Sequence, residues 1–454
     1  MPNPSNAACR PGRGALAACL LVLAQVAGAA DWNLDTAFNG GFAFADWALT
    51  AGTQTHLATD ASGAVFVATT VRPASGFDRE FAVAKFRANG SLDTGFGFFG
   101  LRTLDFDLVA DGFDQLHGVR ALASGRLMLL GTAEVAGNAY VPALARLTAA
   151  GNADASFGSD GRRVITTAPW PLADIELPLV AHQPDGKYLF GGWCDDGPSQ
   201  RSAVVLRVDA DGEPDPAFGN GGWASLPVPW PSRFSSITLD RAGRIVLAGF
   251  DGDLSNDPHM PLLARFLPDG SPDLGFGIGT GYVRLTNVPL APPQGGWLGH
   301  ALAADRDGSL LLSLTIDEDM DAMDGGIVRV TADGTLDTAF GVNGLRRIDP
   351  ENGARIDALA VRSDGRIVAT GFINHTGGSR DVLVARLRAD GSLDSGFSGD
   401  GLVRFELDPE TDGASALGLQ AGKPLLAGYA NRGGDWDAFA LRLQSDLIFS
   451  DGIE

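Results

Sequence analysis

Three side chains that could perform acid–base or metal chemistry recur at one offset in this sequence. His117, His300 and Asp357 each stand eight residues before a glycine that we place in a tight turn. Equal offsets in a repeated structure predict equal depth, at the level where the strands lining a central channel begin. Two imidazoles and a carboxylate could hold a transition metal or serve a hydrolase or lyase. The alternative is that they lie too far apart to act together, because they come from the second, fifth and sixth repeats.

Large aromatic residues form a second candidate set. Four of them fall between the last strand of one repeat and the first strand of the next, and a fifth lies in a loop between a second and a third strand: Trp47, Trp170, Trp230, Trp297 and Trp436. Trp170 and Trp230 each stand between two prolines, which would hold the ring rigidly. Rigid, exposed indoles stack on sugar rings or peptides at low entropic cost, so this set predicts ligand binding. The alternative is that the rings fill gaps between neighbouring loops.

Acidic loops in two successive repeats form the third set. Calcium takes six to eight oxygen ligands, and the carboxylates here could supply them: Asp251, Asp253, Asp257, Asp317, Asp319 and Asp321. A loop with Asp209, Asp211 and Asp215 is a further calcium alternative. Against both stands the simpler interpretation of solvated, charged loops.

These candidates are carried by a segment of about sixty residues that recurs seven times. Each copy has a cation near the end of an apolar run: Lys85, Arg146, Arg207, Arg265, Arg329, Arg386 and Arg442. In the first six copies an aspartate follows eight residues later and a phenylalanine three after that, as in Asp394 and Phe397. A further pair, Asp35 and Phe38, stands alone near the N-terminus. Since these residues occur in every copy, we expect the cation and aspartate to pair or cap turns and the phenylalanine to pack between sheets.

Each copy reads as four strands around a glycine turn. In the last full copy we expect strands at residues 356–361, 367–371, 382–387 and 402–407. Four-stranded units of this period predict an all-β, seven-bladed β-propeller over residues 31–446. Its last blade would take its outer strand from residues 42–47, so that N- and C-terminal strands pair and close the ring.

The repeat resembles a known family in three markers that stay in register. The stretches DGRIVATGF and VARLRADGSLDSGFSGDG, which begin at Asp364 and Val384, are similar to the delta-60 repeat of bacterial proteins. The resemblance covers almost the whole chain after residue 30. It implies a propeller related in pattern to NHL repeats, and it implies no catalytic residues.

Composition restricts the compartment and the partners. Residues 1–30 resemble a signal peptide, with Arg10 and Arg13 before an apolar run and small residues at its end, which predicts a secreted protein: extracellular, on the cell surface or in the periplasm of a bacterium. The formal charge of −21 argues against nucleic acid and anionic membranes as partners. No later stretch predicts a membrane span, and residues 447–454 form a tail outside the repeat.

The spacing between repeats varies most in one place. The connections around each outermost strand differ in length, whereas the count from cation to aspartate is constant. Variable loops on a rigid scaffold usually carry binding. We therefore predict a non-enzymatic binding or adhesion module whose ligand, a glycan or a protein, lies on the irregular loop face; calcium is a possible cofactor. The alternatives are a hydrolase or lyase with its site at the channel mouth, and a purely structural repeat module.

Overall fold

A computed structural model describes residues 34–47, 50–72, 78–197, 200–252, 259–289, 298–319, 322–348, 352–420 and 423–444. The expected signal peptide and the C-terminal tail lie outside these residues. Within the described part of the chain, no helix is long and apolar enough to cross a membrane. The only helical elements described there are three short 3-10 segments: η1 (Asn39–Gly41), η2 (Ala123–Gly125) and η3 (Leu172–Asp174).

All other regular structure is β, and the strands follow one another in groups of four. The first two sheets contain β2 (Thr50–Thr59), β3 (Val65–Arg72), β4 (Glu80–Phe86) and β5 (Leu101–Leu104), then β6 (Gln115–Ala121), β7 (Leu127–Val135), β8 (Ala139–Leu147) and β9 (Arg162–Val164). The next two contain β10 (Ile175–His182), β11 (Tyr188–Gly197), β12 (Gln200–Val208) and β13 (Trp223–Val228), then β14 (Ser232–Leu239), β15 (Ile245–Asp251), β16 (Pro261–Phe266) and β17 (Tyr282–Arg284). The fifth contains β18 (Leu298–Ala304), β19 (Leu310–Asp319), β20 (Ala322–Val330) and β21 (Leu345–Ile348).

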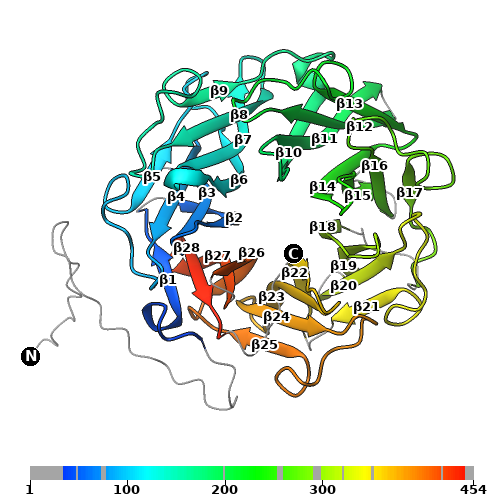
Figure 1. Ribbon diagram of the computed structural model, residues 1–454. Helices are drawn as coiled ribbons and strands as arrows, with labels where there is room; N and C mark the ends of the chain where they lie inside the picture. The colour runs from blue at the N-terminus through cyan, green and yellow to red at the C-terminus, as the bar shows by residue number, and fades with distance from the viewer. Residues whose placement is uncertain are drawn as a thin grey trace, which may run out of the picture. The chain divides into compact units, whose positions relative to one another are not determined.

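The remaining strands form one larger sheet. It contains β22 (Ala354–Val361), β23 (Ile367–Asn374), β24 (Arg380–Leu387), β25 (Leu402–Phe405), β26 (Thr411–Gln420), β27 (Lys423–Arg432), β28 (Asp435–Arg442) and the N-terminal β1 (Phe42–Ala45). The first strand of each group is innermost, and these inner strands contact one another in the order β2, β6, β10, β14, β18, β22 and β26, with β26 against β2 (Figure 1). The sheets therefore stand around a common centre, as in a β-propeller.

The prediction of seven separate blades is wrong. The described residues form five separate four-stranded blades, because β22 to β28 and β1 belong to one continuous eight-stranded sheet. The join is a parallel bridge between Arg380 of β24 and Thr411 of β26. It forms because the short connection before β26 brings the Glu410 carbonyl to 3.3 Å from the Arg380 N–H, which donates to it. Strand β1 pairs antiparallel with β28, from Phe42 opposite Leu441 onward, as the edge of this larger sheet and not of a separate blade.

The repeated cation and aspartate link the sheets. Arg265 Nε donates to Asp273 Oδ2 at 2.7 Å, and Arg265 Nη1 donates to the Ala332 carbonyl of the following repeat at 2.6 Å. The guanidinium carbon of Arg265 lies 4.2 Å from the ring centroid of Phe276. Each of the other copies makes the same ion pair: Lys85–Asp93, Arg146–Asp154, Arg207–Asp215, Arg329–Asp337, Arg386–Asp394 and, between the two ends of the chain, Arg442–Asp35. The predicted pairing is confirmed.

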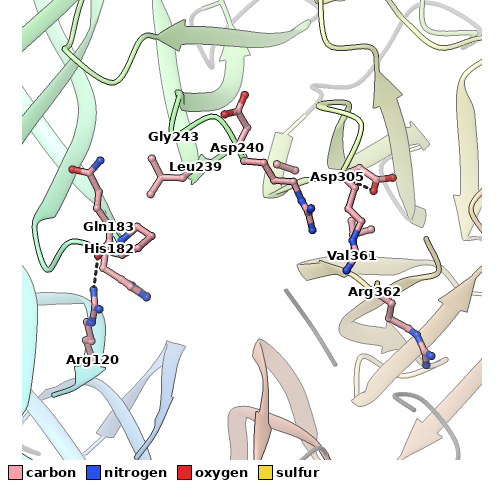
Figure 2. A pocket seen from close by; sticks show the side chains of 13 residues that line it. Arg120, His182, Gln183, Leu239, Asp240, Gly243, Asp305, Val361 and Arg362 are labelled. Carbon is pink, nitrogen blue, oxygen red and sulfur yellow. Dashed lines mark hydrogen bonds between the residues drawn. The ribbon is translucent and has the colours of Figure 1, made fainter. Parts of the chain in front are cut away.

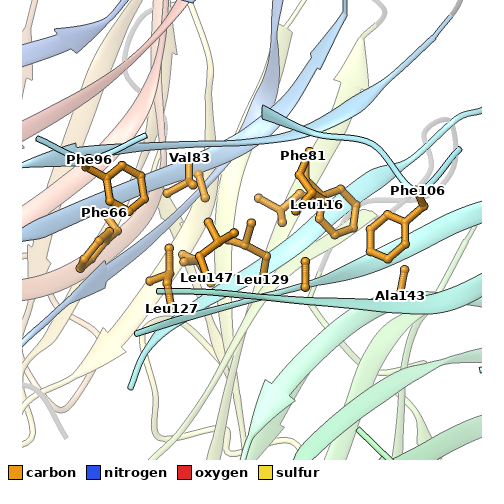
Figure 3. Packing of buried hydrophobic residues seen from close by; sticks show 14 of the residues in the cluster. Phe66, Phe81, Val83, Phe96, Phe106, Leu116, Leu127, Leu129, Ala143 and Leu147 are labelled. Carbon is orange, nitrogen blue, oxygen red and sulfur yellow. The ribbon is translucent and has the colours of Figure 1, made fainter. Parts of the chain in front are cut away.

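The hydrophobic core lies between neighbouring sheets. Successive residues of β3 point to opposite faces, so Phe66 packs toward the β6–β9 sheet while Val65 and Val67 pack toward β28 and β1. Figure 3 shows one such interface, where Phe66 and Phe81 lie opposite leucines of the next sheet. Strands covered on both faces must be apolar along their whole length, which explains the continuous apolar runs of the sequence.

Candidate functional site

Every inner strand is irregular near its start, and this irregularity positions the candidate site. The register against the second strand shifts at residues 51–55, 116–118, 176–179, 234–236, 299–302, 356–358 and 414–416. A β-bulge of this kind adds an unpaired residue and re-aims its side chain. The residues inside these shifts include His117, Ser235, His300, Asp357 and Ser415.

Glycines on the second strands permit the close approach that the bulges require. A Cβ placed on Gly371 would lie 1.9 Å from the Arg355 carbonyl oxygen and 3.1 Å from the Asp357 nitrogen. The corresponding glycines of four other groups would meet an inner-strand carbonyl oxygen at 1.9 or 2.0 Å: Gly131, Gly192, Gly249 and Gly428. In the β18–β21 sheet a hydroxyl group contacts the bulge instead: Ser313 Oγ accepts from the Ala301 N–H at 2.8 Å. The chain thus specifies the bulges locally.

The bulge residues line one cavity of about 490 Å³ in the centre of the ring, which we call the histidine cavity. His117, His300 and Asp357 all line it, so the structure brings together the three residues that shared an offset. Further polar lining comes from Gln54, Thr55, His56, Ser235, Ser236, Arg355 and Ser415, and apolar lining from Leu179, Val180, Phe234 and Ile237. A cavity of this size with mixed lining is typical of a small-molecule site.

The three imidazoles of the histidine cavity are neutral near pH 7. Burial, and after it the charge of the neighbouring His56, lower the pKa of His117 to about 3. Burial likewise lowers the pKa of His56 to about 4. The pKa of His300 falls to about 3, first through burial and then through the charge of Arg355. Each neutral ring has one N–H donor and one acceptor nitrogen.

Hydroxyl groups fix the orientation of two of these rings. His117 Nε2 lies 3.0 Å from Thr132 Oγ1, and His300 Nε2 lies 2.7 Å from Thr315 Oγ1. Each threonine lies on the second strand of the sheet that contains its histidine: Thr132 on β7 and Thr315 on β19. Each ring is therefore held against its own sheet. A ring held in this way presents a defined edge to a ligand.

The carboxylate of the cavity is bound to an arginine. Arg355 Nε donates to Asp357 Oδ1 at 2.7 Å, and Arg355 Nη2 donates to Oδ2 at 3.2 Å. Burial raises the pKa of Asp357, and the charge of Arg355 opposes that rise. The Asp357 side chain is 9% exposed and that of Arg355 is 33% exposed, so the arginine is the more accessible partner. The pair therefore offers a ligand N–H donors beside a carboxylate.

The tryptophans pack against other rings or inside the core. Trp47 is buried among core residues such as Val65 and Ala438. Half-buried Trp170 and Trp230 lie edge-on to Trp223 and Tyr282, with centroids 6.0 and 5.8 Å apart. Half-buried Trp436 lies 5.5 Å from Tyr429, and Trp297 lies outside the described residues. None of the four described rings lines the histidine cavity, and ligand binding by them stays a prediction.

The acidic loops are described only in part. Asp251 is buried, pairs with Arg284 and accepts from the Met260 N–H at 2.6 Å, so it holds its own loop together. Asp253, Asp257 and Asp321 lie outside the described residues, as do the side chains of Asp317 and Asp319. Over the described ranges, no three His, Cys, Asp or Glu side chains gather as metal ligands would. Calcium binding stays a prediction.

Sequence reasoning missed His56, Arg355, Ser235 and Ser415 as cavity residues. The recurring glycine of the second strand could have indicated Arg355, Ser235 and Ser415, since a glycine inside a strand marks a bulge or a close backbone approach. The second strand of the first sheet, VFVATTVR, has no glycine, so this signal does not indicate His56.

Comparison with known proteins supports the fold class. A family model described as "Domain of unknown function (DUF5122) beta-propeller" matches residues 75–96, 122–157, 183–218, 243–276, 322–340 and 362–397. Together with the topology, this identifies a β-propeller repeat protein; the narrower delta-60 resemblance stays a prediction. No curated protein matches the sequence.

Solved structures resemble the chain in fold alone. The polysaccharide lyase Uly1 is 12% identical, with 87% of this chain and 90% of that chain covered and a TM-score of 0.49. A protein of unknown function from Dyadobacter fermentans is 12% identical over 87% and 95% of the two chains, with a TM-score of 0.44. The Trypanosoma rangeli sialidase is 7% identical over 90% and 58%, with a TM-score of 0.44. Similarities this distant carry no argument about function.

Proposed function

We propose that this chain is a non-enzymatic binding protein that takes a neutral, hydroxyl-bearing ligand such as a sugar into the histidine cavity. The observation that carries the proposal is the convergence of the bulge residues of several inner strands on that one cavity. Repeats build a scaffold with equivalent residues, whereas the bulge position is histidine in two repeats, serine in two and aspartate in one: His117, His300, Ser235, Ser415 and Asp357. Such asymmetry on a repeated frame is what a specific site requires.

The chemistry of the lining favours this ligand class. Neutral imidazoles, hydroxyls and an amide both donate and accept hydrogen bonds, as a sugar hydroxyl does. Leu179, Val180 and Phe234 supply apolar surface for the C–H face of a sugar ring. A volume of about 490 Å³ accommodates one or two sugar rings.

Secretion and the placement of the protein at a cell surface belong to this proposal. The support is the predicted signal peptide at residues 1–30 and the acidic composition. An extracellular binding protein would meet free sugars and glycans there.

A hydrolase or lyase is the second candidate, because His117, His300 and Asp357 do share a cavity. A general base works best with a pKa near the working pH. With pKa values of about 3, both histidines are weak bases at neutral pH, and the Asp357 carboxylate is bound by Arg355. These facts favour binding over acid–base catalysis.

The test is calorimetric titration of the full chain with a panel of mono- and disaccharides. Because the proposed hydrogen bonds are lost, His117→Ala and His300→Ala are expected to weaken binding by about tenfold each. His375→Ala, which removes a histidine that pairs with Asp381 outside the cavity, is the matched control and should bind as the parent does. Equal binding by all three variants would contradict the site. If the parent chain converts a sugar and His117→Ala and His300→Ala do not, the protein is an enzyme instead.

A further inference from the structure

A second cavity lies where the inner strands end, at the opposite ends of the strands from the bulges. It has a volume of about 540 Å³, and we call it the arginine cavity. Its lining comes from the last residues of β6, β10, β14, β18 and β22 and from the turns that follow them (Figure 2). It shares no lining residue with the histidine cavity.

The charge of this lining is opposite to that of the chain. The sequence has 34 lysines and arginines against 55 aspartates and glutamates, whereas the arginine cavity has four arginines against two aspartates. The cations are Arg120, Arg241, Arg306 and Arg362. Burial, and after it the charge of Arg120, lower the pKa of the neighbouring His182, so this ring adds no charge near pH 7. The four arginines are not the repeated cations that pair with the repeated aspartates, although Arg120 and Arg362 also make contacts within the scaffold.

The two carboxylates of the lining are engaged in their own turns. Asp240 Oδ2 accepts from Arg244 Nε at 2.6 Å, and Asp240 Oδ1 accepts from two backbone N–H groups of the same turn. Asp305 Oδ1 accepts from the Arg306 N–H at 2.5 Å. They cap the hairpins that carry Arg241 and Arg306, and Asp240 already pairs with Arg244, an arginine outside the lining.

Two of the arginines are held in place. Arg120 Nη1 donates to the Gln183 carbonyl in the next sheet at 3.1 Å. Arg362 is buried, and its Nε and Nη2 lie 3.0 and 2.9 Å from the Asp364 carboxylate oxygens. The contact with the Gln183 carbonyl uses one of the five N–H donors of the Arg120 guanidinium. Figure 2 shows Arg120 and Arg362 on different sheets around the same opening.

Gln183 in the same lining has an unsatisfied hydrogen-bond acceptor, which indicates that the ligand also has a donor group. Gln183 is 8% exposed, and its Oε1 is buried without a hydrogen-bond partner among the described residues. A buried acceptor left without a donor costs about 1–3 kcal/mol. A ligand hydroxyl donating to Gln183 would remove that cost.

We propose that the arginine cavity binds a hydroxyl-bearing oxyanion, of the class of an acidic sugar, with the arginines on the anion and Gln183 on a hydroxyl. Guanidinium groups suit carboxylate, sulfate and phosphate oxygens, because their N–H donors match the spacing of two such oxygens. This site is separate from the proposed neutral-ligand site, and either can fail without the other.

The experiment is calorimetric titration of the full chain with glucuronate, glucose 6-sulfate and glucose 6-phosphate, with glucose and inorganic phosphate as reference ligands. At least one acidic sugar is expected to bind more tightly than either reference, and the three anions separate the possible oxyanions. Exposed Arg241 and Arg306 are replaced in the double variant Arg241→Ala/Arg306→Ala, which is expected to bind about tenfold or more weakly. The control Arg388→Ala/Arg404→Ala removes two exposed arginines elsewhere and should leave binding unchanged.

A second measurement needs no variant. Binding of the acidic sugar by the parent chain is expected to weaken as salt rises from about 50 to about 200 mM, because salt screens charge–charge attraction. The proposal is overturned if no acidic sugar binds, if glucose binds equally well, if salt has no effect, or if the control loses binding as the double variant does. Loss of acidic-sugar binding in His117→Ala would instead place that ligand in the histidine cavity.

Discussion

Removal of Arg265 tests how the sheets are held together. This side chain is 1% exposed, pairs with Asp273 and donates to the Ala332 carbonyl of the following repeat. Arg265→Ala leaves the Ala332 carbonyl without this donor and creates a gap over Phe276. It also leaves Asp273 Oδ2 with only the longer Arg244 contact, at 3.6 Å. Breaking a buried ion pair by removing one partner costs about 3–5 kcal/mol, and we expect the free energy of unfolding to fall by that amount.

Arg265→Lys separates the two parts of this loss. The first repeat already uses a lysine, since Lys85 Nζ lies 3.2 Å from Asp93 Oδ2. A lysine at position 265 would therefore keep the ion pair but lose the donor to Ala332. One hydrogen bond from a charged group is worth about 1.5–3 kcal/mol, so Arg265→Lys should fall between the parent and Arg265→Ala.

The assay is urea unfolding followed by tryptophan fluorescence, with equal denaturant slopes required before free energies are compared. Arg388→Ala is the matched control. Its side chain is 51% exposed and lies 3.7 Å from the Asp394 carboxylate, so its removal should change stability by less than about 0.5 kcal/mol. The reasoning is refuted if Arg265→Ala costs no more than Arg388→Ala.

Three further predictions concern other parts of the chain. Burial raises the pKa of Asp412 from 3.8 to about 7, so between those pH values the folded chain keeps a proton that the unfolded chain loses. The free energy of unfolding should therefore fall as pH rises through this range, by up to about 1.4 kcal/mol per pH unit for this group. Denaturation at several pH values measures this dependence, and Asp412→Asn should remove the part that comes from Asp412. An equal pH dependence in the variant and the parent would contradict the prediction. Gly371→Ala should lower the melting temperature and weaken sugar binding, because the added Cβ would displace the bulge. In the control Gly95→Ala the added Cβ would meet only Asp93 Oδ1, at 3.5 Å, so neither property should change. Identical melting curves for the two variants would count against the role of Gly371. Lys85→Arg should raise the unfolding free energy by about 1 kcal/mol, since an arginine there can add a donor toward the next sheet, and a loss of stability would show that the site is shaped for lysine.

Strand positions could be predicted from the sequence because local signals set them. The strand expected at residues 356–361 is β22, Ala354–Val361, and the one expected at 382–387 is β24, Arg380–Leu387. Glycine turns and apolar runs act over a few residues, so they mark strands well. The merging of two expected blades depends instead on how closely Thr411 approaches Arg380, which no local pattern indicates.

The sequence could predict those residues of the candidate site whose position depends only on their depth along an inner strand. Counting from the turn glycine predicted equal depth for His117, His300 and Asp357, and the structure adds that all three line one cavity. Partners from other positions could not be found in that way. Arg355 joins the site through its ion pair with Asp357 across a bulge, and Trp170 meets Trp223 only because the strands pair.

The most direct test of the central claim is a crystal structure of the protein with the neutral sugar that binds most tightly in the titrations. The account predicts ordered sugar in the histidine cavity, with a hydroxyl within hydrogen-bond distance of His117, His300 or Ser415. Sugar stacked on Trp170, Trp230 or Trp436, with the cavity holding none, would contradict it.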